Sequence, residues 1–379
     1  MPVVEHWAFL DHAAVAPIPR PTHEAVSAWL EDAMLQPGVA WGKWAERLEG
    51  VRRSAARLLH ARPDEVALIR NTTEGINLVA EGWPWQPGDN VVTPAGEFPS
   101  NLYPWMNLAS RGVELRVVPN AGMRVDLDRL EAACDSRTRV VAASWVGYAS
   151  GWRTDVARLA EVAHRHGGLL FLDAIQGLGA FPLDVTAAGV DFMAADGHKW
   201  LLGPEGAGLF YARREHLDRL RPIGLGWNSV AHAGQFDNVS LALKPSAARF
   251  EGGTYPMPGL IGLGASLDLL LDQGIANIAA RILELGDEAC RRLQAIGAEI
   301  ASHRDVDADG HNGRSGIISF ELPGCSPPLV RRECQRRGVV LNCRGGRLRI
   351  SPHAYNNQED IERLIAALEE ISRTTSAKT

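Results

Sequence analysis

The sequence predicts an α/β protein in which a mostly parallel, seven-stranded sheet is sandwiched by helices and joined to a smaller α+β domain. Three observations predict it: seven short apolar runs between residues 66 and 211, helical patterns between most of them, and a change of pattern after about residue 253. Strands that alternate with helices pair in parallel, and strands buried on both faces are almost wholly apolar. We expect a large domain at 15–250 and a small domain at 1–14 and 251–379.

The elements follow from the period of the apolar residues. The strands of the large domain are predicted at Val66–Ile69, Asn90–Val92, Glu114–Val118, Val140–Ser144, Leu169–Leu172, Phe192–Ala194 and Gly208–Tyr211. Its helices are predicted at Glu74–Glu81, Asn101–Ser110, Asp126–Ala133 and Asp155–Arg165. The small domain is expected to contain helices Gly259–Leu271, Ile275–Ile296, Pro328–Arg337 and Glu359–Ile371, strands Gly316–Glu321, Val339–Asn342 and Leu348–Ser351, and a loop at Ser302–Ser315.

Composition and charge exclude several classes of protein. The 379 residues are 46% hydrophobic and 22% charged, which is ordinary for a globular chain. The formal charge of −6 gives no reason to expect nucleic acid or an anionic membrane as a partner. No apolar run reaches ~18 residues, and the N-terminus does not resemble a secretory signal. Five scattered cysteines form no CxxC, so no disulfide framework or metal site is expected, and a reducing cytoplasm is the predicted location.

Two neighbouring strand ends carry unusual polar residues. Asp173 ends the strand in GGLLFLDAIQG, and Lys199 follows the next strand in VDFMAADGHKW. Alone, such an aspartate is more often a helix cap, and such a lysine is usually solvated. Ligands of open α/β sheets bind beyond these strand ends, and pyridoxal 5′-phosphate (PLP) needs an amine for its Schiff base and a carboxylate for its pyridine nitrogen. We therefore predict both as catalytic residues of a PLP enzyme acting on an amino acid through a Lys199 aldimine, from which the freed lysine moves the Cα proton.

A helix N-terminus predicts the phosphate site. Asn71-Thr72-Thr73-Glu74 follows a strand and opens a helix, where free N–H groups and the helix dipole favour an anion. Thr72 and Thr73 would add two hydroxyl donors. An ordinary N-cap explains these residues equally well by themselves. Beside Lys199 and Asp173, the phosphate interpretation is favoured.

These motifs, in this order, resemble the class-V aminotransferase family, whose members share the PLP-dependent transferase fold type I. The resemblance runs from Phe9–Ala14 to Tyr355-Asn356. It is strongest to the branch of cysteine desulfurases and selenocysteine lyases, with kynureninase and isopenicillin N epimerase as relatives. It implies a homodimer with PLP as cofactor and a small amino acid as substrate.

The resemblance also implies the residues that bind the cofactor. Phe98 would stack on the pyridine ring, Gln176 would hydrogen-bond the ring's 3′-oxygen, and His198 would contact the phosphate. Thr254, in a loop that reaches the neighbouring subunit's site, would bind phosphate across the dimer. The implied cofactor-binding residues are Thr72, Thr73, Phe98, Asp173, Gln176, Asp196, His198, Lys199 and Thr254.

Arg349 matches the arginine that grips the substrate α-carboxylate, a task that suits a bidentate guanidinium. Without the resemblance, an arginine inside a small-domain strand would be interpreted as a surface salt-bridge residue. His12 and Asn101 are the other predicted substrate-binding residues.

The chain departs from the desulfurases at four places. Cys343 lies directly before the Arg349 strand with no room for the mobile loop that carries their nucleophilic cysteine, so we interpret it as a small strand-end residue. Phe98 replaces a histidine that helps in proton transfer. Asp196 replaces a serine near the phosphate, and it either orients His198 or points away. No asparagine stands near Gly147, as one does in desulfurases.

The predicted reaction is elimination at Cβ or C–S cleavage of a small amino acid. An isopenicillin N epimerase-like epimerisation and a transamination start from the same Cα carbanion and remain alternatives. A catalytically silent binding protein would be expected to have lost Lys199 or Asp173, and both are present. A dinucleotide enzyme, a metallohydrolase and a P-loop enzyme lack their motifs here, and no metal ligand is predicted.

Overall fold

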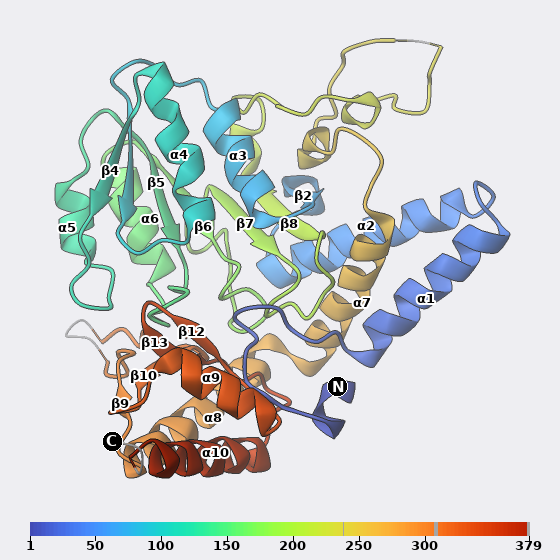
Figure 1. Cartoon of the computed structure of the whole chain (residues 1–379). Helices are drawn as coiled ribbons and strands as arrows, with labels where there is room; N and C mark the ends of the chain where they lie inside the picture. Colours follow the sequence, from blue (N-terminus) through green and yellow to red (C-terminus); the bar gives the residue numbers. More distant parts are fainter. Residues whose placement is uncertain (238, 307–309, 377–379) are drawn as a thin grey trace.

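A seven-stranded sheet forms the centre of the chain in the order β2-β8-β7-β6-β5-β3-β4 (Figure 1). The computed structural model describes residues 1–237, 239–306 and 310–376. Strand β8 runs antiparallel to both of its neighbours, and the other pairs are parallel, which confirms the predicted sheet. The strands are β2 (Val66–Ile69), β3 (Asn90–Pro94), β4 (Glu114–Val118), β5 (Thr138–Ser144), β6 (Leu169–Asp173), β7 (Phe192–Asp196) and β8 (Gly208–Ala212).

Alternate residues of each strand enter two apolar cores, one on each face of the sheet. In β6, Leu170 and Leu172 belong to the core packed by α2, α5, α6 and α7, whereas Phe171 belongs to the core packed by α3 and α4. Both faces are covered, which is why the strands are almost wholly apolar. The covering helices are α1 (Arg20–Leu35), α2 (Trp41–Leu59), α3 (Thr72–Gly82), α4 (Tyr103–Asn107), α5 (Leu127–Ala132), α6 (Val156–Arg165) and α7 (Met257–Gln273).

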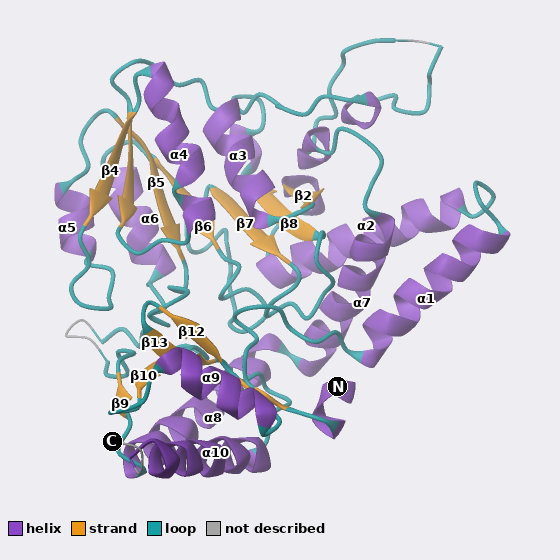
Figure 2. Cartoon of the chain, in the orientation of Figure 1, coloured by secondary structure: helices purple, strands orange, loops and turns teal. Residues whose placement is uncertain are grey.

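The C-terminal third builds a second, smaller α+β unit (Figure 2). A four-stranded antiparallel sheet has the order β12-β13-β10-β9. The N-terminal strand β1 pairs in parallel with β11, so the start of the chain lies with this unit. The proposed boundaries at residues 14 and 250 stay predictions. The elements are β1 (Ala8–Phe9), β9 (Glu299–Ile300), β10 (Ile318–Glu321), β11 (Val339–Val340), β12 (Asn342–Arg344), β13 (Arg347–Ile350), α8 (Ile275–Ala295), α9 (Pro327–Arg336) and α10 (Gln358–Ser376).

Several elements differ from the sequence prediction. Helices α1 and α2 were not predicted, although Trp44, Leu48 and Val51 have the spacing of a buried helix face. The helix expected at Asn101–Ser110 is broken, because Pro104 lies in the first turn of α4 and Leu102 before it is not helical. Residues 307–309 of the predicted loop lie outside the described residues, and the rest of that loop contains no helix or ladder strand.

No single helix among the described residues is long and apolar enough to cross a bilayer, although α7 and α8, which meet at 81°, pass the same length and composition test as a bent pair.

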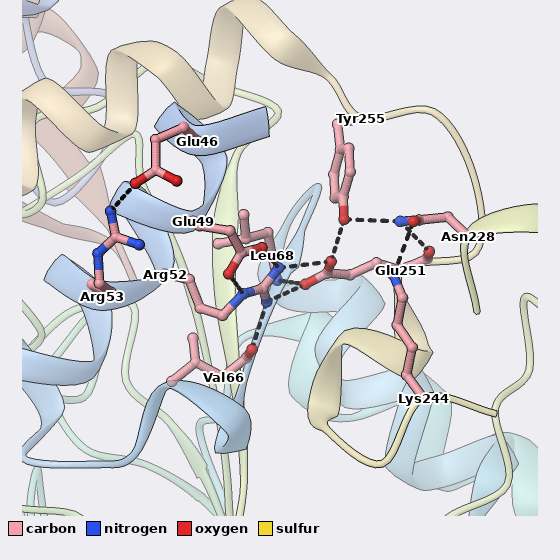
Figure 3. Close-up of polar contacts among 10 residues, drawn as sticks. All are labelled: Glu46, Glu49, Arg52, Arg53, Val66, Leu68, Asn228, Lys244, Glu251 and Tyr255. Carbon is pink, nitrogen blue, oxygen red and sulfur yellow. Dashed lines mark hydrogen bonds and ion pairs between the residues drawn. The ribbon is translucent and has the colours of Figure 1, made fainter. Parts of the chain in front are cut away.

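A buried ion pair between Arg52 and Glu251 holds residues 251–255, the segment just before α7 (Figure 3). Glu251 accepts hydrogen bonds from both terminal nitrogens of Arg52, at 2.5 and 3.0 Å, from the Leu68 amide at 2.7 Å and from the Tyr255 hydroxyl at 2.6 Å. Asn228 donates to the Glu251 carbonyl and to the Tyr255 hydroxyl oxygen. The carboxylate therefore joins α2, β2 and residues 251–255 into one polar cluster.

We expect Glu251→Gln to lower the free energy of unfolding by about 3 kcal/mol, because it removes the buried one of the two carboxylates that pair with Arg52 and leaves only the half-exposed Glu49. Glu46→Gln is the matched control. The Glu46 carboxylate pairs with Arg53 on the surface, and such pairs contribute about 0–1 kcal/mol. Denaturant unfolding of both variants measures the difference, and equal losses would contradict this account.

Candidate active site

The register of three parallel strands places the first acidic residue of the site. Asp173, the last residue of β6, lies between Ser144 of β5 and Ala194 of β7. Strand β7 ends at Asp196, and Lys199 follows three residues later. The turn needs Gly197, since a Cβ there would lie 2.8 Å from the Ala207 carbonyl oxygen. The carboxyl ends of β6 and β7 therefore deliver a carboxylate and an amine to one edge of the sheet.

Asp173 is a buried carboxyl group with few partners. One of its oxygens accepts a hydrogen bond from the Ile175 amide at 3.1 Å, and no described residue donates to the other. Burial raises the pKa of Asp173 to about 6, although the Ile175 hydrogen bond and the positive charge of Lys199 oppose the rise. An ionised carboxylate in this place requires a further cationic or N–H partner.

Lys199 is half-buried and makes no hydrogen bond or ion pair with the residues that the structure describes. Its Nζ lies 5.7 Å from the centre of the Phe98 ring. Burial lowers the pKa of Lys199 to about 8, while the negative charge of Asp173 opposes the fall. A lysine with a lowered pKa has more of the neutral amine that attacks an aldehyde.

These residues fit PLP. The acceptor oxygen left over on Asp173 suits a protonated pyridine nitrogen, and the unpaired amine of Lys199 suits a covalent bond to the aldehyde. Phe98 is 43% exposed although it is apolar, and its ring beside the amine offers a face for a flat cofactor. Within the described part of the chain, these three residues would hold the ring end of the cofactor.

The predicted phosphate site lies at the N-terminus of α3. The Asp196 amide donates to the Thr72 hydroxyl oxygen at 2.9 Å, which ties the start of α3 to the end of β7 and leaves the hydroxyl proton of Thr72 able to donate. Thr73 donates to Ser100 at 2.9 Å. The Asp196 carboxylate lies 3.0 Å from Nδ1 of His198, at ion-pair distance but without hydrogen-bond geometry. Of the two alternatives from the sequence, contact between Asp196 and His198 is the one observed.

Thr254 lies in a cavity beside the first turn of α3 that Lys199 does not line. It lines a cavity of about 730 Å³ together with Thr73, Arg70 and Asn77. The Glu251 cluster of Figure 3 holds the base of the Thr254 segment. The structure thus brings Thr254 near the first turn of α3, and its role across a dimer stays a prediction.

Arg349, which is predicted to bind the substrate carboxylate, lies on β13 and is almost fully buried. Its Nη1 donates to the Tyr148 carbonyl at 2.7 Å, and its Nη2 donates to Asp11 at 3.1 Å. Its Nε is buried without a hydrogen-bond partner among the described residues. The Tyr148 ring packs edge-on against Phe98, with centroids 5.3 Å apart. A contiguous series of contacts therefore joins Arg349 to the ring beside Lys199.

Two predicted site residues, Gln176 and His12, use most or all of their hydrogen-bonding groups within the protein. Gln176 donates to the Ala13 carbonyl and accepts from the Trp200 indole, which leaves one N–H for a ligand. His12 is buried, with Nδ1 bonded to the Ser351 carbonyl and Nε2 to the Tyr355 hydroxyl. Both ring nitrogens are engaged, so the geometry favours a positioning role over substrate contact for His12.

Asn101 shares a buried polar cluster with a carboxyl group that the sequence analysis missed. The Asn101 amide donates to Glu97 at 2.9 Å and accepts from the Trp105 indole at 3.1 Å. Glu97 also accepts from the Ser144 amide and hydroxyl. Burial raises the pKa of Glu97 to about 7, and the negative charge of Asp173 adds to the rise. The only feature of the sequence that could have indicated a role for Glu97 is its position directly before Phe98.

A lysine amine without a partner among the described residues and a buried carboxyl group at the ends of adjacent strands are what a PLP-dependent enzyme on an α/β fold requires, and that is the class of this protein. The chain belongs to the aminotransferase class-V family, whose model matches residues 8–364. It is 33% identical to a probable cysteine desulfurase of Methanothermobacter thermautotrophicus, over 98% of this chain and 96% of that protein. It is 32% identical to a cysteine desulfurase of Cronobacter sakazakii, over 97% of this chain and 93% of that protein.

Solved structures agree with these relatives. The apo structure of a cysteine desulfurase from Thermococcus onnurineus NA1 matches with a TM-score of 0.88 at 26% identity, over 99% of this chain and 96% of that one. The predicted family, its cysteine desulfurase-like branch, the fold and the PLP cofactor are thereby confirmed.

The lowered pKa of Lys199 predicts how the apoenzyme captures PLP. The neutral amine forms as pH rises through about 8, so the rate of covalent attachment should increase over that range and level off above it. Stopped-flow absorbance of apoenzyme mixed with PLP, from pH 6.5 to 10, measures the profile. A midpoint near the ordinary lysine value of 10.5 would contradict the burial of this amine.

Proposed function

We propose that this chain is a cysteine desulfurase-like lyase that cleaves the Cβ–S bond of a small sulfur amino acid. Two observations support the proposal: the unpaired Lys199 amine beside the buried Asp173, and relatives named cysteine desulfurases that cover nearly the whole chain. When bound, PLP supplies an electron sink for the negative charge that develops at the substrate Cα. Expulsion of sulfur from Cβ uses that charge.

Each residue has a separate task in this proposal. Lys199 holds the cofactor through a Schiff base and, once released, moves the Cα proton. Asp173 keeps the pyridine nitrogen protonated, because a buried carboxylate strongly favours a paired cation. Phe98 stacks on the ring, and Arg349 orients the α-carboxylate through the fork of its guanidinium.

Cys343 takes no part in the proposed reaction. Strands β12 and β13 are joined by a two-residue turn, Gly345-Gly346, whose positive φ angles of 56° and 77° suit a tight hairpin. A mobile cysteine loop has no place in that turn. Burial also raises the pKa of the Cys343 thiol, which opposes the thiolate that a persulfide relay needs. In the proposed elimination the sulfur would therefore leave with the electron pair of the Cβ–S bond, as sulfide released to solvent.

The proposed assembly is a cytoplasmic homodimer. The Thr254 segment lines an open cavity with the α3 N-terminus, and a second subunit placed there would share its phosphate site. All five cysteines are free, which suits a reducing compartment.

Cys343→Ser should leave the rate of sulfide release from cysteine within about twofold of wild type, because the thiol carries no sulfur in this reaction. Lys199→Ala should lower that rate by roughly 1000-fold or more, since both covalent attachment and proton transfer are lost. A methylene blue assay under a mild reductant measures both. If Cys343→Ser is as inactive as Lys199→Ala, a persulfide relay operates after all.

Arg349→Gln should raise the KM for cysteine roughly 100-fold, as loss of a buried charge pair costs about 3 kcal/mol. The KM for cysteine amide, which lacks the α-carboxylate, should change little. A similar KM increase for both substrates would show that Arg349 supports the site without binding the α-carboxylate.

A further inference from the structure

The substrate end of the site contains a second arginine that the proposed reaction does not use. Asn342 and Arg349 are opposite one another in the β12–β13 hairpin. Alternate residues of a strand point to the same face, so Arg344, two residues after Asn342, lies on the face that carries Arg349. Arg347, directly opposite Arg344, lies on that face as well, so three guanidinium groups share one side of this small hairpin.

One carboxylate links the two arginines. Arg344 Nη1 donates to the Asn342 side-chain oxygen at 2.9 Å, and the Asn342 amide donates to Asp11 at 2.7 Å. The other oxygen of Asp11 accepts from Arg349 at 3.1 Å. The Nη1 of Arg344 also donates to the Cys343 carbonyl at 2.8 Å. Its Nε and Nη2 have no acceptor among the described residues.

The hairpin tip lies over the wall of the site. A Cβ added to Gly345 would be 3.9 Å from the Ala149 Cβ, so the turn packs beside the Tyr148–Ala149 segment. Tyr148 contacts Phe98, whose ring is beside Lys199. The positive charges of Arg344 and Arg349 also act on that lysine. Burial is the largest cause of the lowered pKa of Lys199, and both charges lower it further.

With a simple amino acid as substrate, Arg344 would have no carboxylate as a direct partner within the described part of the chain. Glu321 offsets Arg347, Asp11 offsets one of the other two guanidinium groups, and the α-carboxylate of an amino acid pairs with Arg349. A half-buried arginine on the hairpin face that carries Arg349, with two donor nitrogens unused, suits a second anionic group.

We propose that Arg344 binds an acidic group on the substrate side chain, so that the site selects amino acids with a carboxylate or sulfur oxyacid beyond Cβ. The inference rests on the proposed function for the place of Arg349 and deepens it by naming the substrate class. If Arg344 instead bound the α-carboxylate together with Arg349, the site would not select substrates with an acidic side chain.

Two unreactive acids separate these cases by isothermal titration calorimetry on the PLP-loaded enzyme. Succinate and butyrate both have four carbons and differ in the second carboxylate. Wild type should bind succinate about 10-fold or more tightly than butyrate, as expected of one additional charge-assisted pair. Arg344→Gln should abolish this preference and leave butyrate affinity within about twofold. Arg344→Lys, which keeps the charge without the fork, should retain part of it.

Arg347→Gln is the matched control. Arg347 lies on the same hairpin but is engaged by Glu321 at 2.7 Å, and its loss should leave the succinate preference unchanged. Visible absorbance of bound PLP in each variant verifies that the site is formed. Equal affinity of wild type for the two acids, or a preference that persists in Arg344→Gln, would overturn the proposal. So would a parallel loss of both affinities in Arg344→Gln.

The binding ratio is independent of turnover. A lost preference in Arg344→Gln would support the acidic subsite even if no sulfur amino acid were cleaved, and that second result alone would refute the lyase assignment.

Discussion

The active site depends on two opposite charges, a buried carboxyl group and a half-buried amine, that lie at the ends of adjacent strands without a full set of protein partners. The register of β5, β6 and β7 places Asp173 in the middle of the sheet, and the Gly197 turn returns the chain so that Lys199 lies over the same edge. Burying these groups costs free energy. The cost is offset when a cofactor supplies a cation for one and a covalent partner for the other.

The small unit completes the site through long-range contacts. Arg349 comes from a strand far along the chain, yet its guanidinium is held by Asp11, near the N-terminus, and by the Tyr148 carbonyl. The pairing of β1 with β11 keeps the N-terminal segment in that position. Substrate binding at Arg349 would therefore be coupled to the docking of the small unit on the sheet.

Functional residues at the ends of strands could be predicted from the sequence, and contacts between residues far apart in the sequence could not. Asp173 and Lys199 follow apolar strands directly, so residue type and position indicate their place. Arg349 required the family resemblance, since an arginine in a strand has no signal of its own. Glu97 and Arg344 were missed because their importance arises from partners such as Asn101, Asn342 and Asp11, which only the folded chain brings close.

Borohydride reduction followed by peptide mass mapping tests the central claim most directly. The chain has only four lysines, at positions 43, 199, 244 and 378, so the site of modification is readily resolved. This account predicts one reduced PLP group per chain, on the peptide that contains Lys199, and its loss in Lys199→Ala. A reduced PLP group on another lysine, or none in protein purified with its visible absorption band, would contradict it.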